Sequence, residues 1–191
     1  MDLLNTNMVE AAGRIINQSG INALSIEEMS REMGIAQDIL LFYFKKDDDI
    51  LILLLRSLEN EIKQFVSDVN TRDMSSEEEL QTLFETLIDL FGQKPYYLSI
   101  IFSTELADKD AAIQEILLRI KSLAKIHLIK IINHGKKDKM FQTKQTTGAL
   151  ANNILRSFRL LMNEQRVIDN MVQDIEILKN TGDTIKENYR S

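Results

Sequence analysis

The chain has no cysteine, no tryptophan, one proline and two histidines among its 191 residues. Without cysteine it cannot form disulfides, thiolate zinc sites or iron–sulfur clusters, and it cannot use a cysteine nucleophile. The single proline and seven glycines also supply few turn residues. Sheet proteins need many turns, whereas long helices joined by short loops need few, so the composition favours an all-α fold.

Long hydrophobic runs are missing as well. The longest, over 50–55, is far too short for a transmembrane helix. The first residues lack the basic and apolar segments of a signal peptide, so we expect a cytoplasmic protein that does not contact membranes. We find no glycine-rich phosphate loop, His–carboxylate metal motif or nucleophile–base pair. The sequence therefore predicts no catalytic residue, no cofactor and no metal site.

Apolar residues recur at helical spacing near the N-terminus. They form one face of a first helix that ends at Ser19-Gly20, and this face consists of Met8, Ala11, Ala12, Ile15 and Ile16. Ser25 and Glu28 have the spacing of a capping box, which predicts a second helix that Gly34 ends. A third short helix is expected over 36–42. Three short helices with a tight turn between the last two predict a helix-turn-helix.

The rest of the chain predicts a larger helical body. Its long first helix opens at 45–49, with apolar residues from Leu51 to Val69. Further helices are expected over 75–92, 95–106, 110–133 and 143–162, with a polar loop at 135–139, and an apolar stripe resumes over 168–178.

The N-terminal stretch resembles the tetracycline-repressor-like (TetR) family of regulators. The resemblance covers residues 8–55 and rests on order and spacing without insertions. Its residues are Ala11-Ala12, Gly20, Leu24 to Ser30, Met33-Gly34-Ile35, Leu40 and the aromatic pair Tyr43-Phe44 followed by charged residues. Beyond residue 55 the similarity is one of helix number and order.

The resemblance implies a homodimeric, ligand-responsive repressor that reads palindromic double-stranded operator DNA. The helix-turn-helix domain would span 1–46, and the ligand-binding and dimerisation domain would span 47–191. Tyr43, Lys45 and Lys46 would contact DNA by resemblance, and Gln37 by its position on the recognition helix. The last two long helices would form the dimer interface.

The charge distribution leaves a second function open. Residues 1–50 hold four basic and nine acidic side chains, a balance of −5, although phosphate neutralisation by cations supplies much of DNA affinity. Ala36 stands where the family has a capping Ser or Thr, and Asp47 where it commonly has a lysine. With the apolar Leu41 and Phe42, these departures permit a TetR-fold protein that has lost operator recognition and binds a ligand or a protein instead.

Aromatic and other large side chains of the body are candidate walls of an effector pocket, because ligand sites are mostly apolar with few polar anchors. Each could also be an ordinary core residue. The predicted ligand-binding residues are Phe84, Phe91, Tyr97, Phe102, His127 and Met162. For Asp47, Asp48 and Asp49, helix capping is the preferred interpretation over a cation site, because consecutive residues cannot all face one ion.

Overall fold

The computed structural model describes residues 3–70, 73–106 and 109–164, and in these residues it contains helices and no strand. The chain forms two compact units, 1–151 and 152–191, which are described separately. The helices of the first unit are α1 (Leu3–Ser19), the short 3-10 helix η1 (Ile21–Ala23), α2 (Ile26–Met33), α3 (Gln37–Leu40), α4 (Asp48–Asn70), α5 (Ser76–Gln93), α6 (Tyr96–Ile101) and α7 (Ala111–Lys137). A further helix runs over 147–164.

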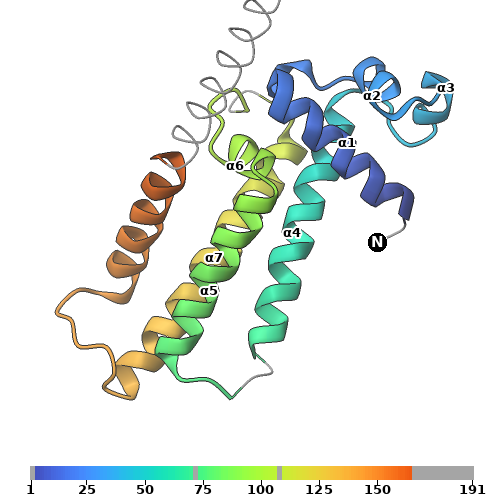
Figure 1. The fold of residues 1–191 in the computed structure, drawn as a ribbon. Helices are drawn as coiled ribbons and strands as arrows, with labels where there is room; N and C mark the ends of the chain where they lie inside the picture. The colour runs from blue at the N-terminus through green and yellow to red at the C-terminus, as the bar shows by residue number, and fades with distance from the viewer. Residues whose placement is uncertain (1–2, 71–72, 107–108, 165–191) are drawn as a thin grey trace, which may run out of the picture. The chain divides into compact units, whose positions relative to one another are not determined.

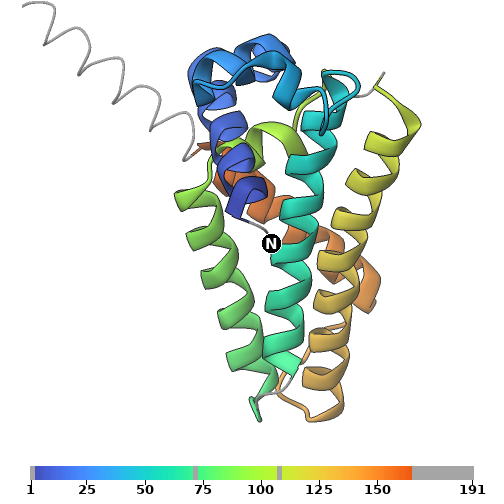
Figure 2. The same ribbon diagram turned by 90° about the vertical axis from the view of Figure 1, so that its right-hand side faces the viewer.

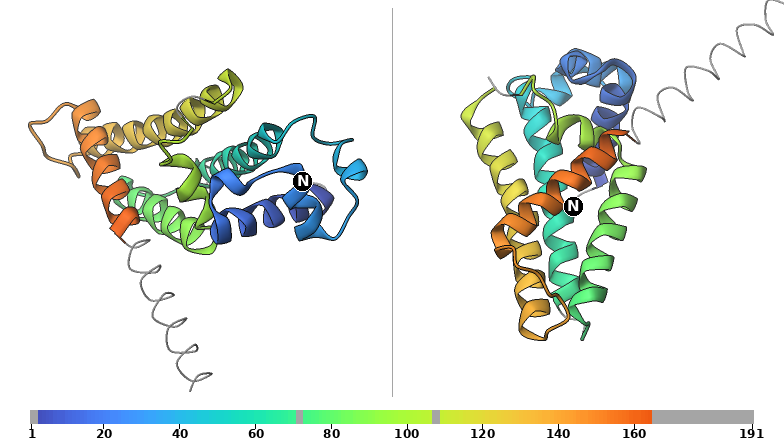
Figure 3. Two further views of the ribbon diagram at one scale, coloured as in Figure 1. Left: turned by 90° about the horizontal axis from the view of Figure 1, so that it is seen from above. Right: turned by 90° about the vertical axis from the view of Figure 1, so that its left-hand side faces the viewer.

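The long helices α4, α5 and α7 lie side by side, and α1 to α3 gather at one end of them (Figures 1 and 2). The view from above places α4 between α7 and α1 (Figure 3), and α4 packs against both. None of the described helices is both long and apolar enough to cross a membrane. The all-α fold with a helix-turn-helix near the N-terminus is therefore confirmed.

Local signals place the boundaries of α2 and α5. The Ser25 side chain accepts a hydrogen bond from the Glu28 amide at 3.1 Å, but the Glu28 carboxylate pairs with Arg31. The capping box expected there thus forms in one direction only. At α5 the reciprocal box is complete, since Ser75 and Glu78 each cap the other. Gly34 ends α2 with a left-handed φ of 65°, a conformation that favours glycine.

Several expected boundaries were wrong, and the helix expected from 143 begins at 147. The third helix is Gln37–Leu40 rather than 36–42, because the chain tightens into i→i+3 turns after it. The helix after Pro95 ends at Ile101 rather than near 106, where the Ser103 hydroxyl accepts a hydrogen bond from the Glu105 amide. Gly135 lies inside α7 rather than in a loop, and the Phe141 ring occupies the space that a Cβ would need.

The core of the first unit is formed by the apolar faces that the spacing predicted. On α4 these buried residues are Leu51, Leu54, Leu55, Leu58, Ile62 and Val69. The corresponding buried residues of α7 are Ile113, Ile116, Leu117, Ile120, Leu128 and Ile131. Two buried stripes that face each other hold α4 and α7 together. They thereby fix α4, the helix that follows the three-helix head, as we call α1 to α3.

Candidate nucleic-acid interface and ligand groove

The turn around α3 presents its side chains to solvent. Gln37 is exposed at the start of α3, and Tyr43 is 51 % exposed just after it. Phe44 is buried and anchors the end of the turn in the core. Phe42 is 81 % exposed, and Leu41 is exposed beside it. The surface around α3 therefore combines the polar side chains of Gln37 and Tyr43 with the apolar side chains of Leu41 and Phe42.

The two lysines after α3 differ in their partners. Lys45 Nζ donates to the Leu41 carbonyl at 3.0 Å. Lys46 Nζ forms an ion pair with Asp110 at 2.5 Å, which raises the pKa of Lys46 and lowers the pKa of Asp110. Asp110 also caps α7 by accepting from the Ala112 amide. A contact between Lys46 and a phosphate would have to replace this ion pair.

The three consecutive aspartates take separate structural roles. Asp47 accepts from the Ile26 amide at 2.8 Å and so caps the start of α2. Asp48 pairs with Lys109 Nζ at 2.7 Å, and Asp49 accepts from the amides of Lys45 and Lys46. These bonds agree with the capping interpretation. No cluster of potential metal ligands occurs within the described part of the chain.

The remaining cations of the head are also paired. Arg14 pairs with Glu32, and Arg31 pairs with two glutamates of its own helix, Glu27 and Glu28. Within the described ranges, Lys45 is the one cation of residues 3–50 whose charge has no carboxylate partner. Lys45 is therefore the cation of the head most available to a phosphate.

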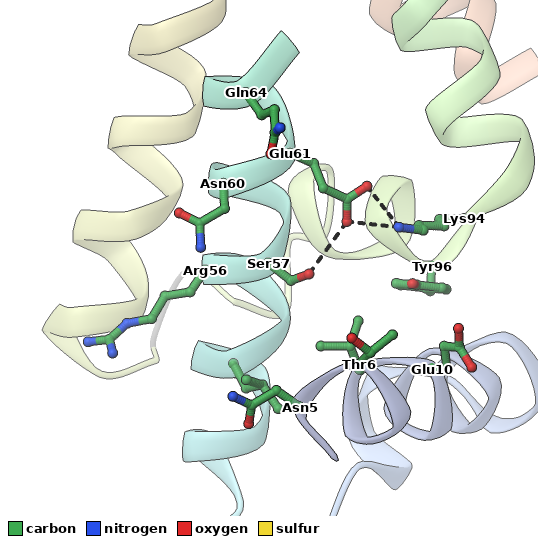
Figure 4. Close-up of a pocket in the computed structure, with 12 residues that line it drawn as sticks. Asn5, Thr6, Glu10, Arg56, Ser57, Asn60, Glu61, Gln64, Lys94 and Tyr96 are labelled. Carbon is green, nitrogen blue, oxygen red and sulfur yellow. Dashed lines mark hydrogen bonds and ion pairs between the residues drawn. The ribbon is translucent and has the colours of Figure 1, made fainter. Parts of the chain in front are cut away.

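A groove of about 850 Å³ lies between α1 and α4 and is completed by residues at the start of α6 (Figure 4). We call it the α1–α4 groove. Its polar lining includes Thr6 and Glu10 of α1, Ser57 and Glu61 of α4, and Lys94 and Tyr96. A volume in this range suits a small molecule. The groove thus joins the first helix of the head to the first helix of the body.

A connected polar network lies at the floor of the groove. Lys94 Nζ contacts both carboxylate oxygens of Glu61, at 2.9 and 2.8 Å. The Tyr97 hydroxyl donates to Glu61 Oε1 at 2.8 Å and contacts Ser57 Oγ at 3.1 Å. Burial raises the pKa of Tyr97, so its phenol stays neutral and remains a donor. The network holds the Glu61 carboxylate in a fixed position.

None of the predicted ligand residues belongs to the lining of this groove, although the Tyr97 hydroxyl contacts two of its lining residues, Ser57 and Glu61. Tyr97 and Phe91 are buried, Phe84 and Phe102 are half-buried, and none of these four belongs to the groove lining. Met162 belongs to the second unit, which the structure describes from 152 to 164. The predicted stripe over 168–178 lies outside the described residues. The role of these residues in ligand binding stays a prediction.

The residues that line the groove were not predicted from the sequence. Ser57 and Glu61 lie one turn apart on α4 and interrupt an otherwise apolar stripe, and this was the signal available for them. Their partner Lys94 is 33 residues from Glu61, so the spacing could not reveal the pair. Glu10 belongs to no motif of the sequence that would have distinguished it from other residues of the first helix.

His127 is buried between the helices of the body and is 3 % exposed. Its ring meets Phe65 edge-on, with centroids 6.4 Å apart, and its Nε2 lies 3.5 Å from Glu79 Oε1. That nitrogen has no hydrogen-bond partner in the described structure. Burial lowers the pKa of His127, whereas the Glu79 carboxylate acts in the opposite direction. His127 is therefore a neutral imidazole with one unused ring nitrogen.

We expect stability to fall as His127 is forced to titrate. Because the pKa is lower in the folded chain than in the unfolded chain, the unfolded chain takes up a proton first as the pH drops below about 6.5. The free energy of unfolding should therefore decrease between about pH 7 and 5.5, by at most ~1.4 kcal/mol per pH unit. Urea unfolding at several pH values would measure this.

The matched comparison for this prediction uses the second histidine. His127→Gln should remove the pH-dependent part of the stability, and His134→Gln, at an exposed position of the same helix, should keep it. Equal pH dependence in the wild-type chain and His127→Gln would contradict a buried neutral His127.

Comparison with known proteins gives matches among solved structures alone. No protein-family profile and no curated protein matches the sequence. A TetR transcription regulator from Haloarcula marismortui matches with a TM-score of 0.73 and 20% identity, over 86% of this chain and 87% of that one. The MbdR regulator from Azoarcus sp. CIB matches with a TM-score of 0.72 and 19% identity, over 86% and 87%. FadR from Bacillus subtilis, solved with stearoyl-CoA, matches with a TM-score of 0.70 and 17% identity, over 86% and 88%.

At these identities the likeness is one of fold. It extends over most of each chain, from the helix-turn-helix into the helical body, so the similarity seen in residues 8–55 of the sequence continues in three dimensions. The proteins that share the arrangement are described as transcriptional regulators.

Proposed function

Since the chain has the fold of TetR-type transcriptional regulators, we propose that it is a regulator of this type: a homodimeric, cytoplasmic repressor that binds palindromic double-stranded DNA and responds to a small molecule. The observation that carries the proposal is the exposure of Gln37 and Tyr43 on the second half of a helix-turn-helix. A recognition helix fits the major groove, and a two-fold dimer matches two half-sites. The head would span 1–46 and the body 47–191.

The proposed DNA contacts divide into two kinds. Gln37, at the start of α3, has the donor and acceptor needed to pair with an adenine edge in the major groove. Tyr43 and Lys45 follow the recognition turn and would bind phosphates, with Lys46 joining them if its pair with Asp110 opens. The effector would lie in the body, against Phe84, Phe91, Tyr97, Phe102, His127 and Met162, and the dimer would form through the last two long helices.

The test is DNA binding across a salt series, with random-sequence DNA and the DNA upstream of the gene as targets. Association should weaken steeply as salt rises. The double variant Lys45→Ala/Lys46→Ala should bind roughly tenfold more weakly at low salt, with a shallower salt dependence. Lys121→Ala is the matched control, because Lys121 is an exposed lysine of α7 far along the chain from the head.

A second function is favoured by the apolar surface beside α3. Ile39, Leu41 and Phe42 are all exposed there, and an exposed apolar patch often marks a protein contact. The ion pairs of the head also favour this function, because they leave few cations to neutralise phosphates. If the full chain fails to bind either DNA at low salt, the function would be that of a TetR-fold protein that binds a ligand or a protein without an operator.

A further inference from the structure

Residues 37–44, which we call the recognition segment, follow a helical path that continues beyond the end of α3. The amides of residues 41–44 each bond to a carbonyl three or four residues back. Leu40 and Phe44, one turn apart, are both buried and define the inner side of the segment. At about 100° per residue, Phe42 lies directly opposite that inner side. The backbone therefore directs the Phe42 side chain outwards.

The exposed fractions agree with this geometry. Phe42 is 81 % exposed, the largest value among the large apolar side chains that the structure describes. Asp38, one turn back, and Ile39 flank it and are exposed too. Gln37 lies about 140° round the helix from Phe42. Since α3 lies at the outer edge of the three-helix head (Figures 1 and 3), an aromatic ring is the central feature of the exposed face of the recognition segment.

The ring of Phe42 has no hydrogen-bond donor or acceptor, so it cannot pair with the polar edge of a base. In the major groove, the thymine C5-methyl group is the apolar feature by which a protein distinguishes base pairs. Burying that methyl group against a ring is favourable and does not depend on phosphate charge. Such a contact suits this chain because, among the cations described in residues 3–50, Lys45 alone lacks a carboxylate partner.

DNA fits this surface better than a second protein does. The apolar area consists of three exposed side chains, Ile39, Leu41 and Phe42, with the acidic Asp38 beside them. A stable protein interface needs roughly 800 Å² from each partner. One side chain is enough to contact a methyl group, and the second half of a helix-turn-helix is the part that enters the major groove.

We propose that Phe42 is a specificity-determining residue, which packs against the C5-methyl group of a thymine in each half-site of the operator. The inference rests on the proposed function, because it requires the recognition segment to enter the major groove. It deepens that function by naming a base that the operator contains. Asp38, beside the ring, disfavours guanine, whose major-groove edge carries acceptors only.

The test starts by identifying the operator. Double-stranded DNA of random sequence is selected for binding to the full chain, and the enriched sequences give the half-sites. Each thymine of a half-site is then replaced in turn by uracil, which lacks only the C5-methyl group. At one position this replacement should weaken binding roughly fourfold for each methyl group removed, and roughly tenfold or more when both half-sites are changed.

Variants of the chain assign the effect to the ring. Phe42→Ala should bind the thymine and the uracil operator equally, and Phe42→Leu should keep part of the preference. Both variants should unfold at the same temperature as the wild-type chain, because the ring is largely exposed. Leu118→Ala is the matched control, since Leu118 is an apolar residue of α7 that is 64 % exposed and lies outside the head. It should keep the full preference for thymine.

Three results would overturn the inference and leave the regulator in place: half-sites without a fixed thymine, equal binding with uracil at every thymine position, or a Phe42→Ala variant that keeps the whole preference. If no sequence is enriched at low salt, the proposed function itself fails, and the inference fails with it. The exposed ring would then belong to a protein contact.

Discussion

Replacing Tyr97 by alanine is expected to lower the free energy of unfolding by about 3–5 kcal/mol, as for other large aromatic residues in a core. Tyr97 is fully buried, and its ring packs against that of Tyr96 with centroids 4.5 Å apart. The substitution would leave a cavity under the groove. It would also deprive Glu61 and Ser57 of the phenol that now contacts both of them.

Tyr97→Phe separates the ring from the hydroxyl. It keeps the packing and removes one buried donor, so it should cost about 1 kcal/mol. Urea unfolding followed by circular dichroism would give both values. If alanine cost no more than phenylalanine, the ring would contribute nothing by packing, contrary to its complete burial.

Gly13→Ala is expected to destabilise the chain by about 1–3 kcal/mol, although alanine is the better helix former. Gly13 lies inside α1, and a Cβ there would come within 2.6 Å of Tyr96 Cδ1 and 2.8 Å of Tyr96 Cζ. Tyr96 is itself buried and packs against the Tyr97 ring, so moving its ring to relieve the overlap would disturb that packing. The energetic cost of this overlap should exceed the ~1 kcal/mol by which alanine stabilises a helix relative to glycine.

Gly92→Ala is the matched control for this substitution. Gly92 also lies in a helix, α5, but a Cβ at this position meets no atom within 4 Å. Its stability should stay the same or rise by up to about 1 kcal/mol. A stabilised Gly13→Ala variant would show that α6 does not pack against α1 through this residue.

The fold could be read from the sequence because its determinants are local. Ser25, Gly34 and Ser75 each define a helix end through neighbours within a few residues, and the apolar stripe of α4 repeats at fixed spacing. The errors arose where a distant or irregular contact decides the boundary. Gly135 reads as a loop residue until Phe141 is seen to fold back onto it.

The candidate sites were predictable to a smaller extent. The exposure of Gln37 and Tyr43 agrees with their positions on a recognition turn. The partners of Lys46 and Glu61 could not be found, because Asp110 and Lys94 lie 64 and 33 residues away in the chain. Whether a lysine is free or already neutralised depends on tertiary structure, and a count of charges does not reveal it.

The ion pairs between the starts of α4 and α7 have a consequence for the thermodynamics of the proposed DNA association. In one pair Lys46, just before α4, contacts Asp110 at the start of α7. In the other pair Lys109, just before α7, contacts Asp48 at the start of α4. If Lys46 turned to a phosphate, it would exchange one fixed carboxylate for another anion, and Asp110 would take up a mobile cation from solution. The cation that Asp110 takes up would cancel part of the entropy gained when DNA releases its counterions. Lys46 should therefore strengthen DNA binding with little added salt dependence. Lys45, which has no carboxylate partner, should contribute the full salt dependence of one phosphate contact.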